Sequence, residues 1–413
     1  MSEITVRGKE NTAKGTSRWL TVSTFVLVIF STVMIASANI TNTTTVVSDV
    51  TTAVVRQSLY IILAYGIYIF AIRYFSFGLV RKLIHLLIYV MAGLLIFTRF
   101  FAPVGGAYAW IRLGPLTLQP SEFAKALIIL VAANYLCDIK GKKYKSGWSI
   151  IRLPLLTALA YTIIIVVVER DFGSGFALFA VFCFCLLVPS NKMLRGWQIA
   201  IVCTMILVSL ATVYLMSPGF KEFITSEPVT MWLDSGSTLA NFFSKISYQF
   251  YRFISAGDPL WDRFGYSQEL LNSLLGMSRG NIYGIGLGNS IQKFGYLASA
   301  DADYIFPVIV EELGIIGILL VFVPYLIIYF VLIKYALLVK KEKEKVVLIG
   351  TFAYLFVHMF LNIGGVSAFI PLTGVPLLMV SRSGSALLSI MACLGMCQNI
   401  IRKYNQGKEN NES

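Results

Sequence analysis

Carboxylates and one long polar segment interrupt the apolar runs of this chain, and these residues are the best placed to do chemistry. The segment Gly265–Gly314 is rich in glycine and polar residues, and an apolar run begins within it near Ile305. Asp303 lies just before that run, and Glu311 and Glu312 lie inside it. Ionisable side chains are costly in a bilayer, and those found there mark reaction sites or transport pathways. The pattern therefore indicates chemistry or transport by a membrane protein.

Asp303 has two interpretations from the residues alone. A carboxylate at the outer mouth of a helix can act as a general base, or it can stabilise the positive end of the helix dipole. Ser121, Glu122 and Lys125 open another apolar run, and their spacing of three and four places them on one helical face. Lys125 is the natural partner to keep Asp303 ionised. Alternatively, Lys125 extends to the membrane surface, as long basic side chains do.

Further charged and aromatic residues lie toward the expected outer side. Arg112, Arg279 and Lys293 could each bind a phosphate group or serve as rim charges. Trp110 could stack on a sugar or anchor the chain at the interface.

The apolar run after Asp303 and the last apolar run also carry charges. Glu311 lies about 80° around the expected helix from Asp303, so it could support the same site or pair with a basic residue. Arg382, near the outer end of the last apolar run, is a candidate partner for a carboxylate.

Apolar runs determine the expected architecture. Of 413 residues, 57% are hydrophobic and 13% are charged, which is more apolar surface than a soluble domain can bury. Runs of roughly 17–25 apolar residues cross the ~30 Å hydrocarbon core as helices, which satisfy their own backbone groups. We therefore predict an all-α polytopic membrane protein with about ten transmembrane helices, approximately at 19–38, 55–75, 79–98, 122–138, 151–168, 172–188, 196–216, 305–332, 346–365 and 374–400.

The distribution of lysine and arginine predicts the orientation. Basic residues gather near both termini and in alternate loops, whereas the loop 38–53 has none. Because cytoplasmic loops carry this excess, both termini are expected in the cytoplasm. The net charge of +13 is spread over many loops, which argues against a nucleic-acid partner. A cleaved signal peptide is a competing interpretation of the first apolar run.

The expected organisation is a single membrane domain. Residues 18–402 form it, between disordered cytoplasmic tails at 1–17 and 403–413. Residues 217–304 form one large extracellular loop between helices 7 and 8, with short helices at the membrane surface. Asn241–Ile254 has the aromatic and basic mixture of an interfacial segment.

Other reactive residue types favour structural roles. His85 and His358 lie in apolar runs and are expected to make interhelical hydrogen bonds rather than bind metal. The six cysteines lie in or beside the apolar runs, which implies no disulfide framework. The run Gly284-Ile285-Gly286-Leu287-Gly288 does not follow a strand, so it is read as a tight turn and not as a dinucleotide site.

Four separated blocks, in the same order, resemble the SEDS family of polytopic glycosyltransferases in cell-wall synthesis, which includes FtsW, RodA and SpoVE. They are GAYAWIRLGPLTLQPSEFAK (106–125), RDFGSG (170–175), the segment 265–314 and NIGGVSAFIPLTGVPLLMVSRSGSALL (362–388). The chain departs from the family pattern at several positions. Ala109 replaces an arginine, Asp301 replaces a histidine, Glu169-Arg170 replaces a glutamine-proline pair, and the last block lacks its second proline at Leu378.

The resemblance implies polymerisation of lipid II, in which a sugar hydroxyl of one molecule attacks the anomeric carbon of another and a lipid pyrophosphate leaves. Asp303 is then expected to be the general base or the ligand of an assisting Mg or Mn cation, with Lys125 as its catalytic partner. The residues expected to bind substrate are Trp110, Arg112, Glu122, Arg279, Lys293, Glu311 and Arg382.

The same resemblance implies partners and a location. The expected partners are lipid II and the growing glycan, membrane lipid, a class B penicillin-binding transpeptidase, and proteins of the division or elongation machinery. The expected location is the bacterial cytoplasmic membrane, and the last block favours a role at the division septum. Three alternatives stay open, namely an elongation polymerase of the RodA kind, a lipid II flippase, and a catalytically degenerate scaffold for a penicillin-binding protein.

Overall fold

The computed structural model is helical along most of the chain, as the sequence predicts. It describes residues 2–40, 46–104, 106–114, 116–137, 146–229 and 250–412. Ten long helices of the described chain form a bundle, and they match the ten predicted spans: α1 (Ser2–Ala38), α2 (Val46–Tyr74), α3 (Phe77–Phe97), α4 (Pro120–Leu136), α5 (Gly147–Ile164), α6 (Phe172–Leu187), α7 (Arg195–Leu215), α12 (Ile305–Leu338), α13 (Glu342–Val366) and α14 (Gly384–Glu412).

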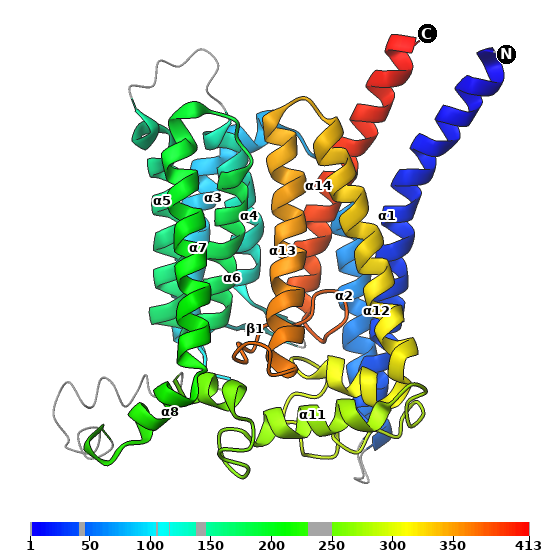
Figure 1. Ribbon diagram of the computed structural model, residues 1–413. Helices are drawn as coiled ribbons and strands as arrows, with labels where there is room; N and C mark the ends of the chain where they lie inside the picture. Colours follow the sequence, from blue (N-terminus) through cyan, green and yellow to red (C-terminus); the bar gives the residue numbers. More distant parts are fainter. Residues whose placement is uncertain are drawn as a thin grey trace.

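Most of these helices can cross a membrane on their own. Eight helical segments in the described chain are long and apolar enough to do so, counting α5 together with the π-helical turn Ile165–Glu169 that follows it. The other two, α4 and α6, have 17 and 16 residues. Both chain ends lie at one end of the bundle (Figure 1), consistent with the expectation that they share one side of the membrane.

The opposite end of the bundle carries the parts of the large loop and a hairpin (Figure 1). The loop contains α8 (Pro218–Thr225), a helical turn at 250–257 and α11 (Gln268–Gly280), which confirms the expected short helices. The interfacial segment predicted at Asn241–Ile254 lies mostly outside the described residues. The antiparallel hairpin pairs β1 (Ile111–Leu113) with β2 (Leu116–Leu118).

The terminal helices are longer than predicted. The backbone of α1 begins at Ser2 and that of α14 continues to Glu412, through the segments expected to be disordered tails at 1–17 and 403–413. The physical reason is that extending an existing helix adds one hydrogen bond per residue, whereas starting a new one is costly.

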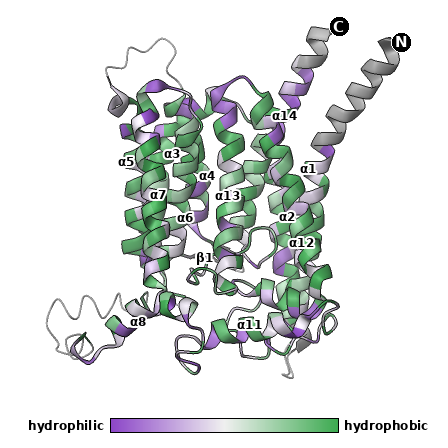
Figure 2. Cartoon of the chain, in the orientation of Figure 1, coloured by the Kyte–Doolittle hydropathy of each residue, from purple (hydrophilic) through white to green (hydrophobic). Residues whose placement is uncertain are grey.

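The surface between the two ends is apolar (Figure 2). None of the residues of α7, all of which the structure describes, is buried. Exposed leucine, isoleucine and valine side chains cover its length. A helix that is apolar all round and exposed all round fits a hydrocarbon environment, since lipid tails replace the protein neighbours.

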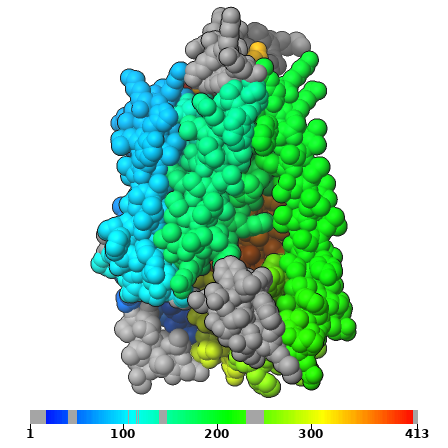
Figure 3. Space-filling view, turned by 90° about the vertical axis from the view of Figure 1, so that its left-hand side faces the viewer, coloured from blue at the N-terminus to red at the C-terminus, as the bar shows by residue number. Residues whose placement is uncertain are grey.

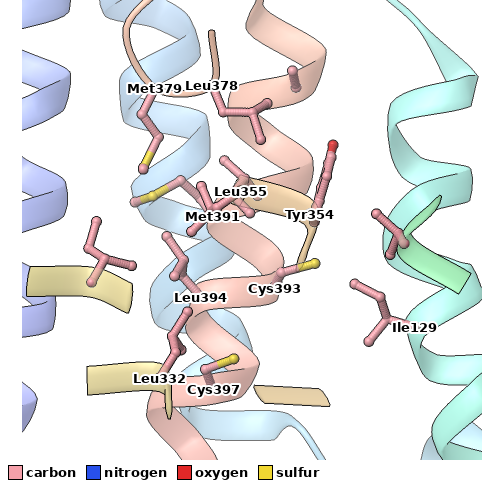
Figure 4. Close-up of a cluster of buried hydrophobic side chains, with 14 of the residues drawn as sticks. Ile129, Leu332, Tyr354, Leu355, Leu378, Met379, Met391, Cys393, Leu394 and Cys397 are labelled. Atoms are coloured by element: carbon pink, nitrogen blue, oxygen red, sulfur yellow. The ribbon is translucent and has the colours of Figure 1, made fainter. Parts of the chain in front are cut away.

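The centre of the bundle is packed by side chains from several helices. Figure 4 shows part of this core, where α13 and α14 meet residues of α4, α12 and the chain before α14. Cys393 and Cys397 lie in it, and the Sγ atom of Cys397 contacts the Oγ1 atom of Thr351 at 3.3 Å. Both cysteines are buried packing residues, in agreement with the prediction.

The last predicted span is only partly helical. Helix α14 begins at Gly384, so residues 374–383 of the predicted span belong to an irregular segment, 367–383, which we call the inner loop. Pro371 and Pro376 cannot donate backbone hydrogen bonds, and Gly374 has a positive φ of 69°. Side chains of neighbouring helices bind its carbonyl groups instead, as non-helical backbone within a bundle requires.

Helix α12 is interrupted at Gly314, whose φ and ψ are 58° and −137°. Its 34 residues would extend about 50 Å, more than a bilayer core needs. At the break, backbone amides of the glycine turn bind the freed carbonyls, with Ile285 N to Glu311 O at 2.9 Å and Gly286 N to Glu312 O at 3.0 Å. Glu311 and Glu312 thus lie at the end of the first helical segment of α12, which begins at Ile305 and stops at the break. The sequence had placed both glutamates inside one continuous span.

Substitution of Gly284 tests the close packing of the glycine turn against the break in α12. A Cβ atom there would lie 2.2 Å from the Glu312 carbonyl oxygen, and φ is +74°. We expect Gly284→Ala to lower the melting temperature of the detergent-purified protein, because it adds a backbone collision to a left-handed strain of about 1–2 kcal/mol.

Gly295 provides the matched control. Its φ is +92°, but nothing lies within 4 Å of the added Cβ, so Gly295→Ala should show the strain alone. Equal melting temperatures for the two variants would contradict the close approach at Gly284.

Candidate active site

Asp303 lies two residues before α12, at the end of the bundle that carries the large loop. The Nδ2 atom of Asn362, on α13, donates to the Asp303 carbonyl at 2.8 Å and to the Val375 carbonyl at 2.9 Å. A Cβ atom on Gly374 would lie 3.6 Å from the Asp303 Oδ2 atom. Asn362 therefore ties Asp303 to the inner loop, and the glycine leaves space beside the carboxylate.

The surroundings of Asp303 favour its protonated form. Burial raises the pKa of Asp303 to about 7, and the carboxylates of Asp171, Glu269 and Asp301 add to the rise, whereas Arg252 lowers it. The residue as a whole is intermediate between buried and exposed. Such a carboxyl can accept a proton near neutral pH, as a general base must.

Asp171 brings a second carboxylate toward this region. It caps the start of α6, where its Oδ1 atom accepts from the Ser174 amide at 2.9 Å. Its Oδ2 atom accepts from the Gln119 side chain at 3.1 Å. Gly173 packs so closely on the inner loop that a Cβ atom would lie 2.3 Å from the Thr373 carbonyl oxygen. This turn is thereby held against the loop that faces Asp303.

Lys125 is fully buried and pairs with Glu122, not with Asp303. Its Nζ atom lies 2.7 Å from Glu122 Oε1 and 3.1 Å from His358 Nε2. Tyr354 donates to Glu122 Oε2 at 2.6 Å. The predicted pairing of Lys125 with Asp303 is therefore corrected, because Glu122 is three residues away on the same helical face and α13 closes the other side. The alternative of extension to the surface is also wrong, since the side chain has 0% exposure.

His358 and His85 make the interhelical hydrogen bonds that the sequence predicted. His358 joins Lys125 on α4 to the Pro376 carbonyl of the inner loop, with Nδ1 at 3.2 Å from that oxygen. His85 on α3 contacts the Tyr135 hydroxyl on α4 at 2.9 Å.

Several buried polar atoms of this part of the bundle have few hydrogen-bond partners. Thr373 Oγ1 and Asn362 Oδ1 are buried with no hydrogen bond within the described residues, and the buried Glu169 carboxylate has Ser121 as its side-chain neighbour. Glu169 interacts electrostatically with Asp171 and Lys125. Buried groups of this kind are few in native proteins and need an explanation. This interior is thus able to hydrogen-bond a polar ligand.

Asp301 is committed to structural contacts. Arg382 contacts Asp301 Oδ2 from its Nε atom at 3.0 Å, and its backbone amide donates to the Asp301 carbonyl at 2.8 Å. Asn39, which follows α1, also donates to Asp301 Oδ2 at 3.0 Å. Arg382 belongs to the inner loop and not to a helical span, which corrects its predicted position. Between the two aspartates, Asp303 is the one with an available carboxylate.

Lys293 and Glu312 form a buried pair that fixes the outer loop to α1. The Lys293 Nζ atom donates to Glu312 Oε1 at 3.0 Å, to Ser37 O at 3.0 Å and to Gly288 O at 2.7 Å. All three ammonium hydrogens are used, so the structure does not support the predicted role of Lys293 in binding substrate.

Glu311 also binds the outer loop. Its carboxylate accepts from Ser290 Oγ at 2.5 Å and lies 3.9 Å from Arg279 Nη1. The predicted support of Asp303 by Glu311 is therefore replaced by support of the turn at 282–293, because Ser290 and the backbone amides of Ile291 and Gln292 bind its carboxylate. Arg279 has 44% side-chain exposure.

The hairpin carries Trp110 and Arg112. Tyr60 on α2 holds it, with its hydroxyl 2.8 Å from the Thr117 carbonyl, and Arg112 is paired in register with Thr117. Arg112 is exposed and makes no ion pair with the described residues. Trp110 is partly buried. Both lie at the end of the bundle that carries the large loop (Figure 1), and their roles in binding substrate stay predictions.

Several site residues were missed by sequence reasoning. Arg252, Asn362 and Tyr354 were not assigned roles, although Asn362 opens one of the four blocks. Tyr108 was missed as well, where Arg99 and Arg170 pack over the ring at 3.9 and 5.5 Å from its centre. The sequence does not indicate this contact, because Arg99 and Arg170 lie far apart in the chain and meet only at the Tyr108 ring.

The residues around Asp303 do not form a metal centre by themselves. Within the ranges that the structure describes, no three His, Cys, Asp or Glu side chains are grouped to hold a metal ion. Hard cations take six or more oxygen ligands, and both Asp301 and Asp171 already accept other hydrogen bonds. Because Mg²⁺ is commonly bound through one or two carboxylates with water and substrate phosphates, the predicted Mg or Mn cation stays a prediction.

The end of α13 and the inner loop are visible from the side of the bundle. In Figure 3, a recess between α5 and α7 shows the colours of the end of α13 and the inner loop. Phe360 and Phe369, with 41% and 69% exposure, belong to this region. The loose packing of α7 thus leaves a lateral, apolar approach to the inner loop beside Asp303.

Comparison with known proteins agrees with this architecture. The FtsW/RodA/SpoVE family, described as cell cycle proteins, matches residues 18–406. This chain belongs to that family. The FtsW/RodA/SpoVE match spans the whole bundle and every site residue described above.

Curated relatives in this family include proteins named "Probable peptidoglycan glycosyltransferase FtsW". The Bacillus subtilis protein is 31% identical over 335 residues, covering 79% of this chain and 75% of that protein. The Lactococcus lactis protein is 32% identical over 349 residues, covering 78% and 76%. The Aeromonas salmonicida protein is 27% identical over 394 residues, covering 93% and 89%.

Solved structures share the fold. A chain from work on structural coordination of polymerization and crosslinking by a peptidoglycan synthase complex has a TM-score of 0.68 and 22% identity, covering 93% of this chain and 97% of that one. The Thermus thermophilus rod shape determining protein RodA has a TM-score of 0.59 and 19% identity, covering 93% and 96%. At these identities the likeness shows the fold alone.

The Glu122–Lys125 pair allows a stability test. Lys125→Met leaves the Glu122 carboxylate buried without its cation, and we expect a loss of about 3–5 kcal/mol, measured as a lower melting temperature in detergent.

The matched control is the double variant Glu122→Gln with Lys125→Met, which removes both charges. It should recover most of the stability lost by the single variant. If the two substitutions instead added their losses, the ion pair would not be the source of the effect.

Proposed function

We infer that this chain is a peptidoglycan glycosyltransferase of the FtsW kind, which polymerises lipid II at the outer face of the bacterial cytoplasmic membrane. Family membership and the names of the relatives support the reaction. The observation that carries the assignment of the reactive group is Asp303, a carboxyl whose pKa is raised to about 7 beside a polar interior.

In this proposal, Asp303 takes the proton of the attacking sugar hydroxyl. The hydroxyl oxygen forms a bond to the anomeric carbon of the second lipid II molecule, and the bond from that carbon to the pyrophosphate oxygen breaks. An ordinary aspartate has a pKa near 3.9 and is a weak base, so the raised pKa makes Asp303 better matched to this task.

The negative charge on the leaving pyrophosphate needs cations. Arg112, which is exposed on the hairpin, is the candidate for this role. Guanidinium groups bind phosphate oxygens with two parallel hydrogen bonds. Lys125 is a positioning residue in this scheme, since it acts through Glu122 and His358 rather than on the substrate.

We also propose a partner and a location. A class B penicillin-binding transpeptidase would crosslink the strands that this chain makes, and the septum is the location that the FtsW relatives favour. The similarity to a chain of a peptidoglycan synthase complex supports such an assembly.

Asp303→Asn provides the direct test of the base. We expect polymerisation of labelled lipid II by the purified protein to fall by a factor of about 10²–10⁴, the usual contribution of a general base.

The control carboxylate is Asp258, which pairs with Lys221 at 2.7 Å on the outer loop. Asp258→Asn should polymerise at the rate of the unaltered protein. An Asp303→Asn variant with full activity would remove Asp303 from the mechanism.

The pH dependence of polymerisation follows from the raised pKa. Because the base must be ionised, the rate should rise through pH 7 and differ roughly tenfold between pH 6 and pH 8. The charged groups that face Asp303 are Asp171, Glu269 and Asp301, which raise its pKa, and Arg252, which lowers it. Arg252→Gln should therefore move the midpoint to higher pH.

Arg263 supplies the control, since it is an exposed arginine on the same loop. Arg263→Gln should leave the midpoint in place. A rate that does not change between pH 6 and pH 8, or a midpoint that moves down in Arg252→Gln, would argue against this electrostatic description.

A further inference from the structure

A cavity of about 370 Å³ opens beside the reactive carboxylate, under the large outer loop. Its size falls in the range of ligand pockets, roughly 300–1,000 Å³. Four separate parts of the chain form its walls, namely the helical turn 250–257, residues 265–270 at the start of α11, Tyr304 before α12 and Leu372 of the inner loop. The residues that matter for its chemistry are Arg252, Ser255, Tyr266, Glu269, Tyr304 and Leu372.

Aromatic rings form a platform at the rim of this cavity, which we call the aromatic platform and define as Tyr251, Trp261 and Tyr266. The ring centres of Tyr251 and Tyr266 are 4.6 Å apart, and the Trp261 and Tyr266 rings are inclined by only 11°. Tyr266 has 49% exposure. The Asp262 carboxylate accepts from the Tyr266 amide at 2.9 Å and holds the turn in place. The three rings therefore support one another in a stacked group, and Tyr266 is the member that lines the cavity.

The polar groups of the cavity are balanced in charge. Arg252 donates from Nη1 to the Leu372 carbonyl at 3.1 Å, and Glu269 accepts from the Tyr304 hydroxyl at 3.1 Å. Ser255 Oγ is buried and has no hydrogen-bond partner within the described residues. The positive charge of Arg252 and the negative charge of Glu269 offset each other, and the Ser255 hydroxyl can still form a hydrogen bond. Such a set suits a neutral ligand with many hydroxyl groups better than an anion.

This combination is the chemistry of sugar recognition. A pyranose ring has an apolar face of C–H groups, which packs on an aromatic ring, and an edge of hydroxyl groups, which exchange hydrogen bonds with arginine and carboxylate side chains. An apolar wall with a few convergent polar groups is also the general form of a binding pocket.

The cavity lies close to the proposed reaction site. Tyr304 follows Asp303 directly in the chain, and Leu372 lies two residues from Gly374, which borders the Asp303 carboxylate. Arg252 and Glu269 both act electrostatically on Asp303. A sugar chain whose reacting end lies at Asp303 would therefore have the cavity beside it.

We propose that the cavity and the aromatic platform form a saccharide subsite, which holds linked sugar rings of the growing glycan beside Asp303. The proposal rests on the glycosyltransferase function proposed above and adds a site for the polymer itself. Its consequence is processivity, because a strand held at the subsite stays bound between successive additions.

The first test measures binding of a soluble β-1,4-linked N-acetylglucosamine tetramer to the full chain in detergent. Tryptophan fluorescence is the signal, and Trp261→Phe identifies the contribution of Trp261 among the six tryptophans. We expect saturable quenching that is absent in Trp261→Phe. The apparent Kd should rise at least tenfold in Tyr266→Ala and in Tyr266→Leu, which keeps the apolar bulk.

Tyr283 is the matched control, since it is an exposed tyrosine of the same loop with 82% exposure. Tyr283→Ala should bind the tetramer as the unaltered protein does. Absence of binding by the unaltered protein, or equal affinity in folded Tyr266→Ala and Tyr266→Leu, would overturn the proposal.

The second test compares product lengths at equal consumption of lipid II. We expect Tyr266→Ala to make strands at least threefold shorter than those of the unaltered protein and of Tyr283→Ala. Equal strand lengths would overturn the role in processivity. An unaltered protein that binds the tetramer but makes no glycan would instead contradict the proposed function, so the two failures can be told apart.

Discussion

Backbone carbonyls that leave helical structure inside the bundle must find donors among side chains, and Asn362 supplies two of these hydrogen bonds from one amide. It binds the carbonyls of Asp303 and Val375 at 2.8 and 2.9 Å. Lipid offers no hydrogen bonds, so the inner loop can exist at this depth only because α13, α12 and the loop itself bind its carbonyls. His358 and Tyr325 bind those of Pro376 and Leu378. The position of Asp303 depends on this satisfied loop.

The ion pair of Glu122 and Lys125 is fully buried, and removing both charges from water costs free energy. Replacing such a pair by apolar residues is often neutral or stabilising, so stability alone does not explain Glu122 and Lys125. Their charges act on Glu169 and Asp171 as well as on each other. The pair is better understood as the inner end of a polar interior that begins at Asp303. In that position it organises the groups that a substrate meets.

The outer loop is held by a different set of contacts. Ser37 and Asn39, at the end of α1, bind Glu312 and Asp301 at 2.6 and 3.0 Å. Lys293 and the glycine turn complete this support around the break in α12. Most of the unusual outer charges therefore stabilise the frame, which leaves Asp303, Arg252 and Arg112 as the groups near the cavity and hairpin. The aromatic platform extends the frame toward the polymer.

The sequence by itself determined the ten helices, the shared side of the two termini and Asp303 as the residue of interest. These follow from run lengths, charge placement and local motifs, which depend on neighbours along the chain. Only the tertiary structure decided that Lys125 binds Glu122, that Arg382 binds Asp301, that Glu311 faces the outer turn and that residues 367–383 are not helical. The reason is that helical periodicity predicts which residues share a face, but not which other helix that face meets. Partners such as Asn362 and Asp303, 59 residues apart, become neighbours only when the bundle is assembled.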